Sequence, residues 1–199
     1  MSRTYEELSE MADGKTFTYV KGVSPADLVT RWGGDPATFT PMTFAEMVEQ
    51  WWRLYDRRVP LVAAAVISDW TLAIDNRYIG VDEKIVERLS AGTRVVSHFL
   101  LEIKALHDFR WFEDGQEQIS FYPQEGFMVG DTHAEPDHMP VAFAEIVGRS
   151  DARFPGVWNI NEGPVFVWAE ELTGITLTPE LLGELSFLGG FLPADPTKP

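Results

Sequence analysis

The feature that most constrains the fold is a set of short apolar segments in the middle of the chain. They form two pairs, and residues typical of a tight turn lie between the two members of each pair. The expected strand pairs are residues 60–67 with 70–75 and residues 109–113 with 116–122. Ser68-Asp69 lies between the first two segments and Asp114-Gly115 between the second two. Asp-Gly supplies the two positive φ values that a type I′ hairpin turn needs. The centre of the chain is therefore predicted to form antiparallel hairpins.

Helical signals lie on both sides of this central part. Thr43 and Glu46 have capping-box spacing at the start of an apolar stripe that runs to Tyr55, and Ser24-Pro25 is a typical helix start. Helices are expected over residues 5–12, from Pro25 to near Gly33, over 43–55, from Asp82 to near Gly92, from Asp137 to Gly148, over 164–172 and from Thr178 through Leu185. Further strands are expected over residues 16–21 and 93–101, and loops over 35–41, 123–139 and 149–163.

This arrangement predicts an α+β fold. We expect a single domain over residues 1–199, with a largely antiparallel sheet of five or six strands flanked by helices. Residues 1–14 are expected to hold a peripheral N-terminal helix, and residues 193–199 a frayed tail.

Composition excludes several classes of protein. The chain has 199 residues, 45% of them apolar, and can bury roughly 70% of its unfolded surface without a disulfide or a metal. Since it has no cysteine, disulfides, thiolate zinc sites, iron–sulfur clusters and cysteine nucleophiles are excluded. No segment reaches the ~18 consecutive apolar residues of a membrane span, and the acidic N-terminus lacks the apolar region of a signal peptide. We expect a cytoplasmic protein.

The net charge of −15 is concentrated in the second half of the chain. Residues 1–110 carry −3, whereas residues 111–199 carry −12. A field of this sign repels phosphate backbones and anionic lipids, so we expect no binding to nucleic acid or membranes. A protein partner with a basic surface would be attracted, although an acidic surface can also serve solubility alone.

Several motifs together resemble those of a known family. They are Ser24-Pro-Ala-Asp-Leu-Val29, Pro41-Met-Thr-Phe-Ala-Glu46, Trp70-Thr-Leu72, Leu89-Ser-Ala-Gly-Thr-Arg-Val-Val-Ser97, Trp111-Phe-Glu-Asp-Gly115 and Ala169-Glu-Glu-Leu-Thr-Gly-Ile-Thr-Leu-Thr-Pro-Glu-Leu-Leu182. From about Phe17 to Leu192 the chain resembles a family of uncharacterised, mainly actinobacterial domains of unknown function. The resemblance implies one bacterial, cytoplasmic domain, and it brings no activity or catalytic residue.

The common catalytic motifs are absent from the sequence. It has no phosphate-binding loop, dinucleotide fingerprint, nucleophile elbow or H-E-x-x-H helix. Asp131, His133 and His138 could hold a metal if their loop folded back on itself, but their spacing fits no familiar set of ligands. We therefore expect no catalytic residues, no cofactor and no bound metal. His98 and His107 could face each other across a strand pair, although a neutral histidine satisfied by a neighbour is the commoner arrangement.

The aromatic residues give a second indication of function. Trp51 and Trp52 are consecutive on the helix over 43–55, so one of them lies at the margin of its apolar stripe or outside it. An exposed Trp beside arginines is typical of an interface anchor, whereas packing under a neighbouring loop is the commoner fate of such a ring.

These observations favour a non-catalytic acidic module that binds a basic protein partner, as an immunity protein or an antitoxin-like accessory protein would. The candidate partner-binding residues are Trp52, Glu113, Asp114, Glu117, Glu125 and Asp131. The alternatives are a small metal-dependent enzyme that uses the Asp131/His133/His138 loop, and a protein that binds only copies of itself.

Overall fold

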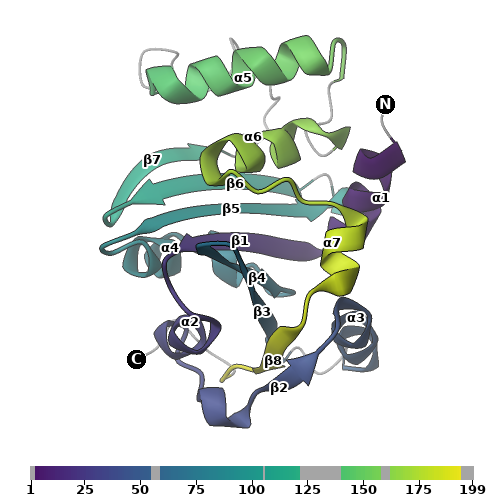
Figure 1. The fold of residues 1–199 in the computed structure, drawn as a ribbon, viewed down its shortest axis with the longest axis vertical. Helices are drawn as coiled ribbons and strands as arrows, with labels where there is room; N and C mark the ends of the chain where they lie inside the picture. Colours follow the sequence, from purple (N-terminus) through teal and green to yellow (C-terminus); the bar gives the residue numbers. More distant parts are fainter. Residues whose placement is uncertain (1–2, 55–58, 105, 122–139, 158–161, 194–199) are drawn as a thin grey trace.

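A computed structural model describes residues 3–54, 59–104, 106–121, 140–157 and 162–193 (Figure 1). Within these residues eight strands form one sheet in the order β2-β8-β3-β4-β1-β5-β6-β7, and every neighbouring pair is antiparallel. The strands are β1 (Lys15–Lys21), β2 (Thr40–Met42), β3 (Leu61–Ile67), β4 (Trp70–Asp75), β5 (Arg94–Leu101), β6 (Leu106–Glu113), β7 (Gln116–Phe121) and β8 (Phe187–Phe191). The predicted α+β class and antiparallel sheet are confirmed.

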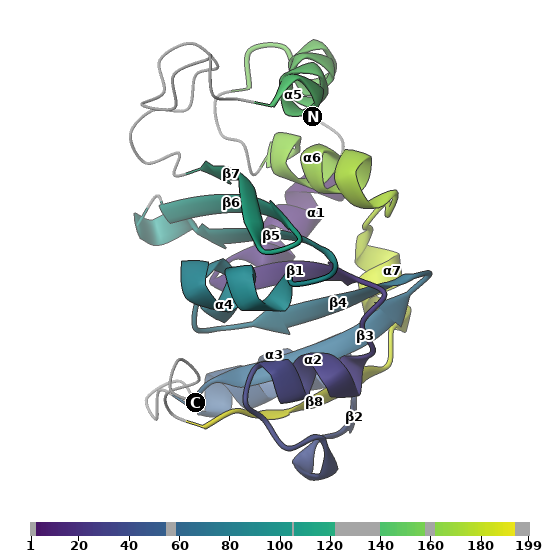
Figure 2. The ribbon, with the colours of Figure 1, turned by 90° about the vertical axis from the view of Figure 1, so that its left-hand side faces the viewer.

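Helices cover both faces of the sheet, as Figures 1 and 2 show from two sides. One face carries α1 (Arg3–Ala12), α3 (Phe44–Arg53), α6 (Pro164–Thr173) and α7 (Pro179–Glu184), and α5 (Val141–Arg153) packs on the outside of α6. The other face carries α2 (Pro25–Arg31) and α4 (Glu83–Leu89). The short 3-10 turns η1 (Pro36–Thr38), η3 (Ile79–Val81) and η4 (Glu102–Lys104) complete the described elements.

The two faces bury separate hydrophobic cores. Successive side chains of a strand point to opposite faces, so β1 places Phe17 and Tyr19 in the larger core and Val20 in the smaller one. Trp168 of α6 packs edge-on against Phe109 of β6 in the larger core. The sheet is thus the middle layer of three.

Local signals in the sequence correspond to the caps and turns of the structure. Thr43 accepts a hydrogen bond from the Glu46 N–H, and the Glu46 carboxylate accepts one from the Thr43 N–H, which completes the predicted capping box of α3. Asp82 caps α4 by accepting from the Ile85 N–H. Asp114 and Gly115 have φ values of 50° and 75° between β6 and β7, as the predicted hairpin turn requires.

The sheet has more strands than the five or six that the sequence predicts. β2 overlaps the end of the predicted 35–41 loop, and β8 lies between the last predicted helix and the predicted tail, where no element is expected. β8 contains Gly189 and Gly190, a residue type that weakens strands, yet both are needed there. An added Cβ would lie 2.3 Å from the Met42 sulfur at Gly189 and 2.8 Å from the Phe39 ring at Gly190. β2 contains Pro41 and is an edge strand, where a missing N–H is tolerated.

The helix that was expected to end at Gly148 also differs. α5 continues to Arg153, so the first part of the predicted 149–163 loop is helical. Gly148 is exposed on this helix, while Ser150 and Phe154 beyond it are buried, and this packing outweighs the modest helix penalty of one glycine. The predicted loop over 123–139 and nearly all of the predicted tail lie outside the described residues. No helix in the described ranges is both long and apolar enough to cross a membrane.

Candidate functional site

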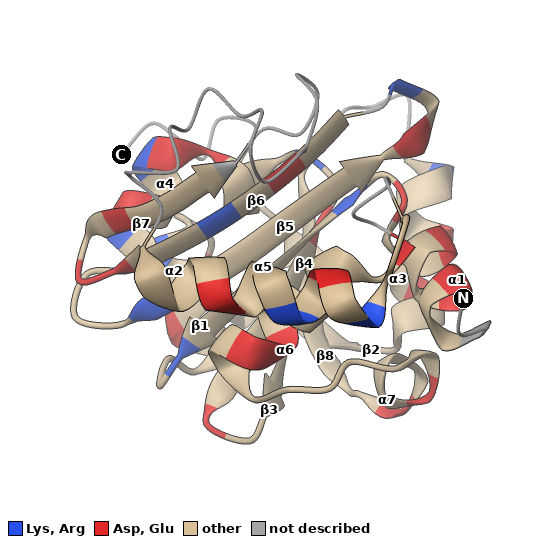
Figure 3. Cartoon of the chain, turned by 90° about the horizontal axis from the view of Figure 1, so that it is seen from above, with Lys and Arg blue, Asp and Glu red and all other residues tan. Residues whose placement is uncertain are grey.

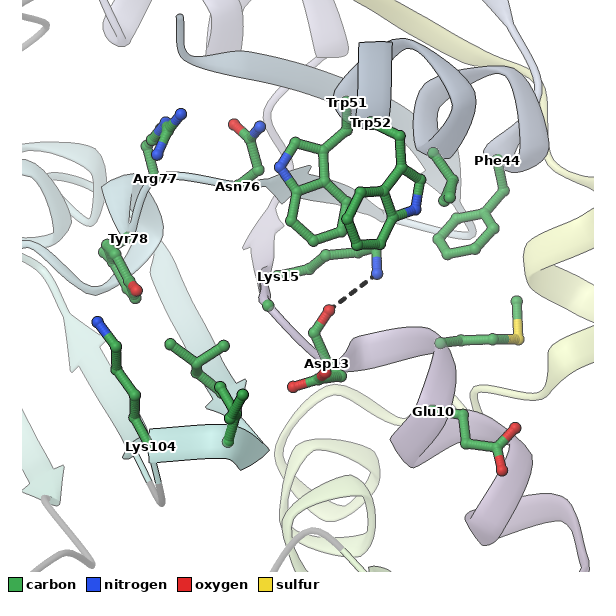
Figure 4. A pocket seen from close by; sticks show the side chains of 15 residues that line it. Glu10, Asp13, Lys15, Phe44, Trp51, Trp52, Asn76, Arg77, Tyr78 and Lys104 are labelled. Atoms are coloured by element: carbon green, nitrogen blue, oxygen red, sulfur yellow. Dashed lines mark hydrogen bonds between the residues drawn. The ribbon is translucent and has the colours of Figure 1, made fainter. Parts of the chain in front are cut away.

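The main candidate site is a pocket of about 940 Å³ at one end of the sheet, drawn in Figure 4. Its walls come from the last turn of α1, the start of β1, one side of α3, the segment between β4 and η3, and the end of β5 with η4. These segments are distant in sequence, so the pocket exists only in the folded chain. We call it the Trp51/Trp52 pocket.

Two consecutive indoles form one wall. The Trp51 and Trp52 rings lie 5.0 Å apart between centroids at 30°. Gly14 makes room for the inner ring, because a Cβ there would lie 2.8 Å from the Trp51 ring. Trp52 is 63% exposed, so the alternative in which it packs under a neighbouring loop is wrong. The outer indole offers an aromatic face at the mouth of the pocket.

Lys15 lies at the base of the pocket and is only 5% exposed. Its amine lies 4.8 Å from the centre of the Trp51 ring and donates a hydrogen bond of 2.9 Å to the Asp13 carbonyl, which Figure 4 shows as a dashed line. Burial lowers the pKa of Lys15 to about 8, and the nearby Asp13 charge opposes that shift. The site therefore contains an amine that titrates close to neutral pH.

A buried carboxylate shapes the opposite wall. Asp75, at the end of β4, accepts hydrogen bonds from the backbone N–H groups of Arg77 at 2.8 Å and of Ile79 and Gly80 at 3.0 Å each. These bonds fold the segment back on itself, with Tyr78 in the left-handed region at φ 61°. Burial raises the pKa of Asp75, and the three N–H donors oppose that shift. The Asp75 loop, residues 75–80, thus presents Arg77 and Tyr78 to the pocket.

The lining charges are unevenly placed. Figure 4 shows Arg77 and Lys104 together on one side, whereas Glu10 and Asp13 belong to the α1 side. Among the described residues of the lining, there are three cations, Lys15, Arg77 and Lys104, against these two carboxylates. In a chain of net charge −15, the pocket is a locally cationic aromatic site.

Among the predicted partner-binding residues that the structure describes, Trp52 lies apart from Glu113, Asp114 and Glu117, which share the β6–β7 hairpin. Trp52 lines the pocket beside Leu101, the last residue of β5, whereas Glu113 forms an ion pair of 2.5 Å with Arg94, the first residue of β5. Asp114, in the turn that follows Glu113, and Glu117, in β7, are both exposed. Glu125 and Asp131 lie outside the described residues.

Another group of carboxylates lies on α3, the helix that carries Trp52, and on α1 and α7. α7 packs against both α1 and α3, and Figure 3 shows acidic residues on all three helices at one side of the molecule. Their exposed members are Glu6 and Glu10 of α1, Glu46 and Glu49 of α3, and Glu180 and Glu184 of α7. Arg53 of α3 is ion-paired with Glu49 at 2.5 Å. We call these six glutamates the acidic helix surface; α1 and α3 come from the first half of the chain and α7 from the second.

His98 and His107 are not cross-strand neighbours. His98 pairs with Phe109 in the sheet and His107 with Leu100, so the two do not face each other. His98 is buried against the rings of Phe17 and Phe166, and its Nε2 has no hydrogen-bond partner among the described residues. Burial lowers the pKa of His98 to about 3. His98 is therefore a neutral ring packed among aromatic rings, and the neighbour that was expected to satisfy it is missing for Nε2 among the described residues.

The residues proposed as alternative metal ligands, Asp131, His133 and His138, lie outside the described part. Within the described ranges, no group of three or more His, Asp or Glu side chains is placed to hold a metal. The sequence also contains no indication of a buried ion pair in β6, in which Arg110 Nε lies 3.1 Å from Asp108 Oδ1. Burial raises the pKa of Asp108 to about 7, although the Arg110 charge opposes that shift.

A family model described as a family of unknown function (DUF6461) matches residues 3–197. This range contains all the segments that line the pocket. No curated protein and no solved structure matches the chain.

Proposed function

The chain belongs to the DUF6461 family of unknown function, and from that premise we propose that it is a non-catalytic binding protein for a protein partner with a basic surface. The partner would be bound as by an immunity protein or an antitoxin-like accessory protein. The bacterial, actinobacterial and cytoplasmic setting implied by the resemblance is part of the same proposal.

One observation carries the proposal: Trp52 is 63% exposed beside the acidic helix surface. Trp is the residue type most enriched among energetic anchors of protein interfaces, because a large rigid ring buries much apolar area at little entropic cost. Trp52 stacks on Trp51, which is held from below by Gly14 and Lys15. The anchor is therefore preorganised.

Charge gives the partner its chemistry. Glu10 lines the same pocket as Trp52, and Glu46 and Glu49 are on the same helix as Trp52. Carboxylates around an apolar anchor steer a basic surface to it and disfavour acidic competitors. A partner that places lysines or arginines around an apolar cleft for Trp52 fits this surface.

The location of the acidic contact refines the expectation from the sequence. Asp114 of the β6–β7 turn and Glu117 of β7 lie near the start of β5, whereas Trp52 lines the pocket at the end of β5. We therefore do not expect one compact partner surface to contact both places. We place the interface on the acidic helix surface. The second half of the chain then contributes through α7.

The test is a pull-down from the native host, followed by binding kinetics of the captured protein over a salt series. Trp52→Ala is expected to weaken binding by roughly 30-fold, the cost of about 2 kcal/mol that defines an interface hot spot. Val141→Ala is the matched control, because Val141 is 76% exposed on the distant helix α5. Glu10→Lys is expected to slow association more than Glu117→Lys, which changes the net charge equally.

Association should also slow as salt rises, since the Debye length is about 8 Å at physiological ionic strength and shorter above it. Salt-independent association, or capture of acidic or neutral partners alone, would contradict the proposal. A stronger effect of Glu117→Lys than of Glu10→Lys would move the interface to the β6–β7 turn. The metal-dependent enzyme remains a separate proposal on Asp131, His133 and His138, and its test is the metal titration described in the Discussion.

A further inference from the structure

The base of the Trp51/Trp52 pocket holds an ammonium group without an anionic partner. Lys15 is 5% exposed, and among the described residues no carboxylate forms an ion pair with its amine. Its hydrogen bond goes to a neutral carbonyl, that of Asp13. Buried charges in proteins are normally paired, so this arrangement calls for an anion from outside the chain.

We propose that the pocket binds a small organic carboxylate with an aromatic body, the carboxylate contacting the Lys15 amine and the ring stacking on Trp52. This inference does not depend on the proposed protein partner, and it assigns the interior of the pocket rather than its acidic surroundings.

The nearest protein carboxylate is held elsewhere. The Asp13 side chain accepts a hydrogen bond of 2.9 Å from the Glu102 N–H, which ties it to the start of η4. Glu10, the other lining carboxylate, is exposed on α1. The Lys15 ammonium has three N–H groups, of which one donates to the Asp13 carbonyl and the Trp51 ring covers another side, so an N–H remains for a ligand.

The remaining lining suits the rest of such a ligand. Arg77 and Lys104 add positive charge across the pocket from α1, and Trp52 adds an aromatic face. Two aromatic rings in an offset or edge-to-face arrangement contribute binding free energy beyond that of the apolar area they bury. A volume of about 940 Å³ is within the range of small-molecule sites. A simple inorganic anion would leave the indole face unused.

The test uses three probes on the purified protein, with Trp fluorescence as the readout. The probes are 1-naphthoate, its neutral analogue 1-naphthamide, and acetate, which has the charge without the ring. We expect naphthoate to bind at least tenfold more tightly than either of the others. Lys15→Met should remove the preference for naphthoate over naphthamide, while Lys84→Met, an exposed lysine on α4, should not. Trp52→Ala should weaken both ring probes.

A measurement on the unaltered protein makes the test independent of how well the variants fold. NMR of the protein with isotope-labelled lysines should show the pKa of Lys15 rising by about one unit or more when naphthoate binds, because a nearby anion favours the ammonium form. Naphthamide should leave that pKa unchanged. Equal affinity for naphthoate and naphthamide, or no binding of naphthoate at about 1 mM, would overturn the inference. Neither result would bear on the protein partner, whose test uses a different ligand.

Discussion

The Lys15 amine lies 4.8 Å from the centre of the Trp51 ring, and this contact joins the first strand of the sheet to α3. A cation over an indole face is favourable, more so when the cation is largely buried, as Lys15 is. The contact does not fully offset the loss of hydration, because the pKa of Lys15 is still lowered to about 8. The base of the pocket thus keeps a charge at some cost to stability.

That cost predicts a pH dependence. The pKa of Lys15 is about 8 in the folded protein and 10.5 in the unfolded chain, so between these values the unfolded state binds more protons. The free energy of unfolding should therefore rise with pH above 8, by up to about 1.4 kcal/mol per pH unit. Below pH 8 both states carry the charge, and the burial penalty is constant. Lys15→Met should lack this rise in urea unfolding between about pH 7 and pH 9.

The titration of tyrosines limits the pH range in which that experiment reports on Lys15 alone. Burial raises the pKa of Tyr19 above its ordinary value of 10, so near and above pH 10 the unfolded state loses a proton that the folded state keeps. This effect lowers stability as pH rises, opposite to the effect of Lys15. It is common to the native protein and to Lys15→Met. An equal slope in both proteins would show that Lys15 is not desolvated.

Most of the fold follows from local signals in the sequence. The capping box at Thr43, the cap at Asp82 and the turn at Asp114-Gly115 depend on neighbouring residues alone, and each is present in the structure. β8 was not predicted because its glycines weaken a strand locally. Glycine is needed at both positions because a Cβ would collide with Met42 or Phe39, which are more than 140 residues away in the chain. The periodicity of the sequence carries no information about such distant contacts.

The candidate site was predictable only in part. Two consecutive Trp residues on an amphipathic helix must differ in burial, which is why Trp52 was singled out. The roles of Lys15 and Asp75 could not be predicted, because a lysine or an aspartate at the end of a strand is usually exposed, and only the tertiary structure shows that these two are buried. The acidic helix surface combines charges from both halves of the chain, so a division of the net charge by sequence position could not locate it.

A second prediction concerns acid. The pKa of His98 is about 3 in the folded protein and 6.5 when unfolded, so between these values the unfolded state binds more protons and stability falls as pH is lowered. His98→Phe should lose that dependence. Between about pH 7 and pH 5 the variant should gain up to about 2 kcal/mol relative to the native protein in urea unfolding.

Asp108 supplies an opposing effect and a control. Its pKa is raised to about 7, so below that pH the folded state binds the extra proton and stability rises as pH falls toward 3.8. Asp108→Asn should therefore shift the acid dependence in the direction opposite to His98→Phe. Shifts in the same direction for both variants would contradict the burial of one of these groups.

The Asp75 loop should depend on its carboxylate. In Asp75→Asn one oxygen becomes an NH₂ group, which leaves at least one of the three backbone N–H donors without an acceptor. We expect a loss of about 1–3 kcal/mol in thermal unfolding, the cost of one buried unsatisfied group. Asp82→Asn is the control, since Asn caps a helix as well as Asp does. Similar losses in the two variants would argue against a special role of Asp75.

Metal titration tests the enzyme alternative. We expect zinc and manganese to leave the melting temperature unchanged, because the spacing of His133 and His138 suits no familiar ligand set. A metal present at 100 times its Kd would stabilise the folded state by about 2.7 kcal/mol, which a melting curve detects easily. A large rise that His133→Ala abolishes would promote the metal-dependent enzyme over the binding protein.

The last prediction tests how Trp51 is held. Gly14 has φ +70°, and an added Cβ there would lie 2.8 Å from the Trp51 ring. Gly22 has a similar φ of +64°, but a Cβ there would meet nothing within 4 Å. Gly22→Ala should therefore cost only the left-handed backbone strain, about 1–2 kcal/mol, whereas Gly14→Ala must in addition displace an indole that packs on Lys15.

The difference between the two variants isolates that displacement. Gly14→Ala should be destabilised by at least about 1 kcal/mol more than Gly22→Ala in urea unfolding, in the range of overpacked sites. Because the moved ring uncovers Lys15, the pKa of that amine should return toward 10.5 in Gly14→Ala and stay near 8 in Gly22→Ala. Equal stabilities and an unchanged Lys15 pKa would mean that Trp51 does not close the base of the pocket.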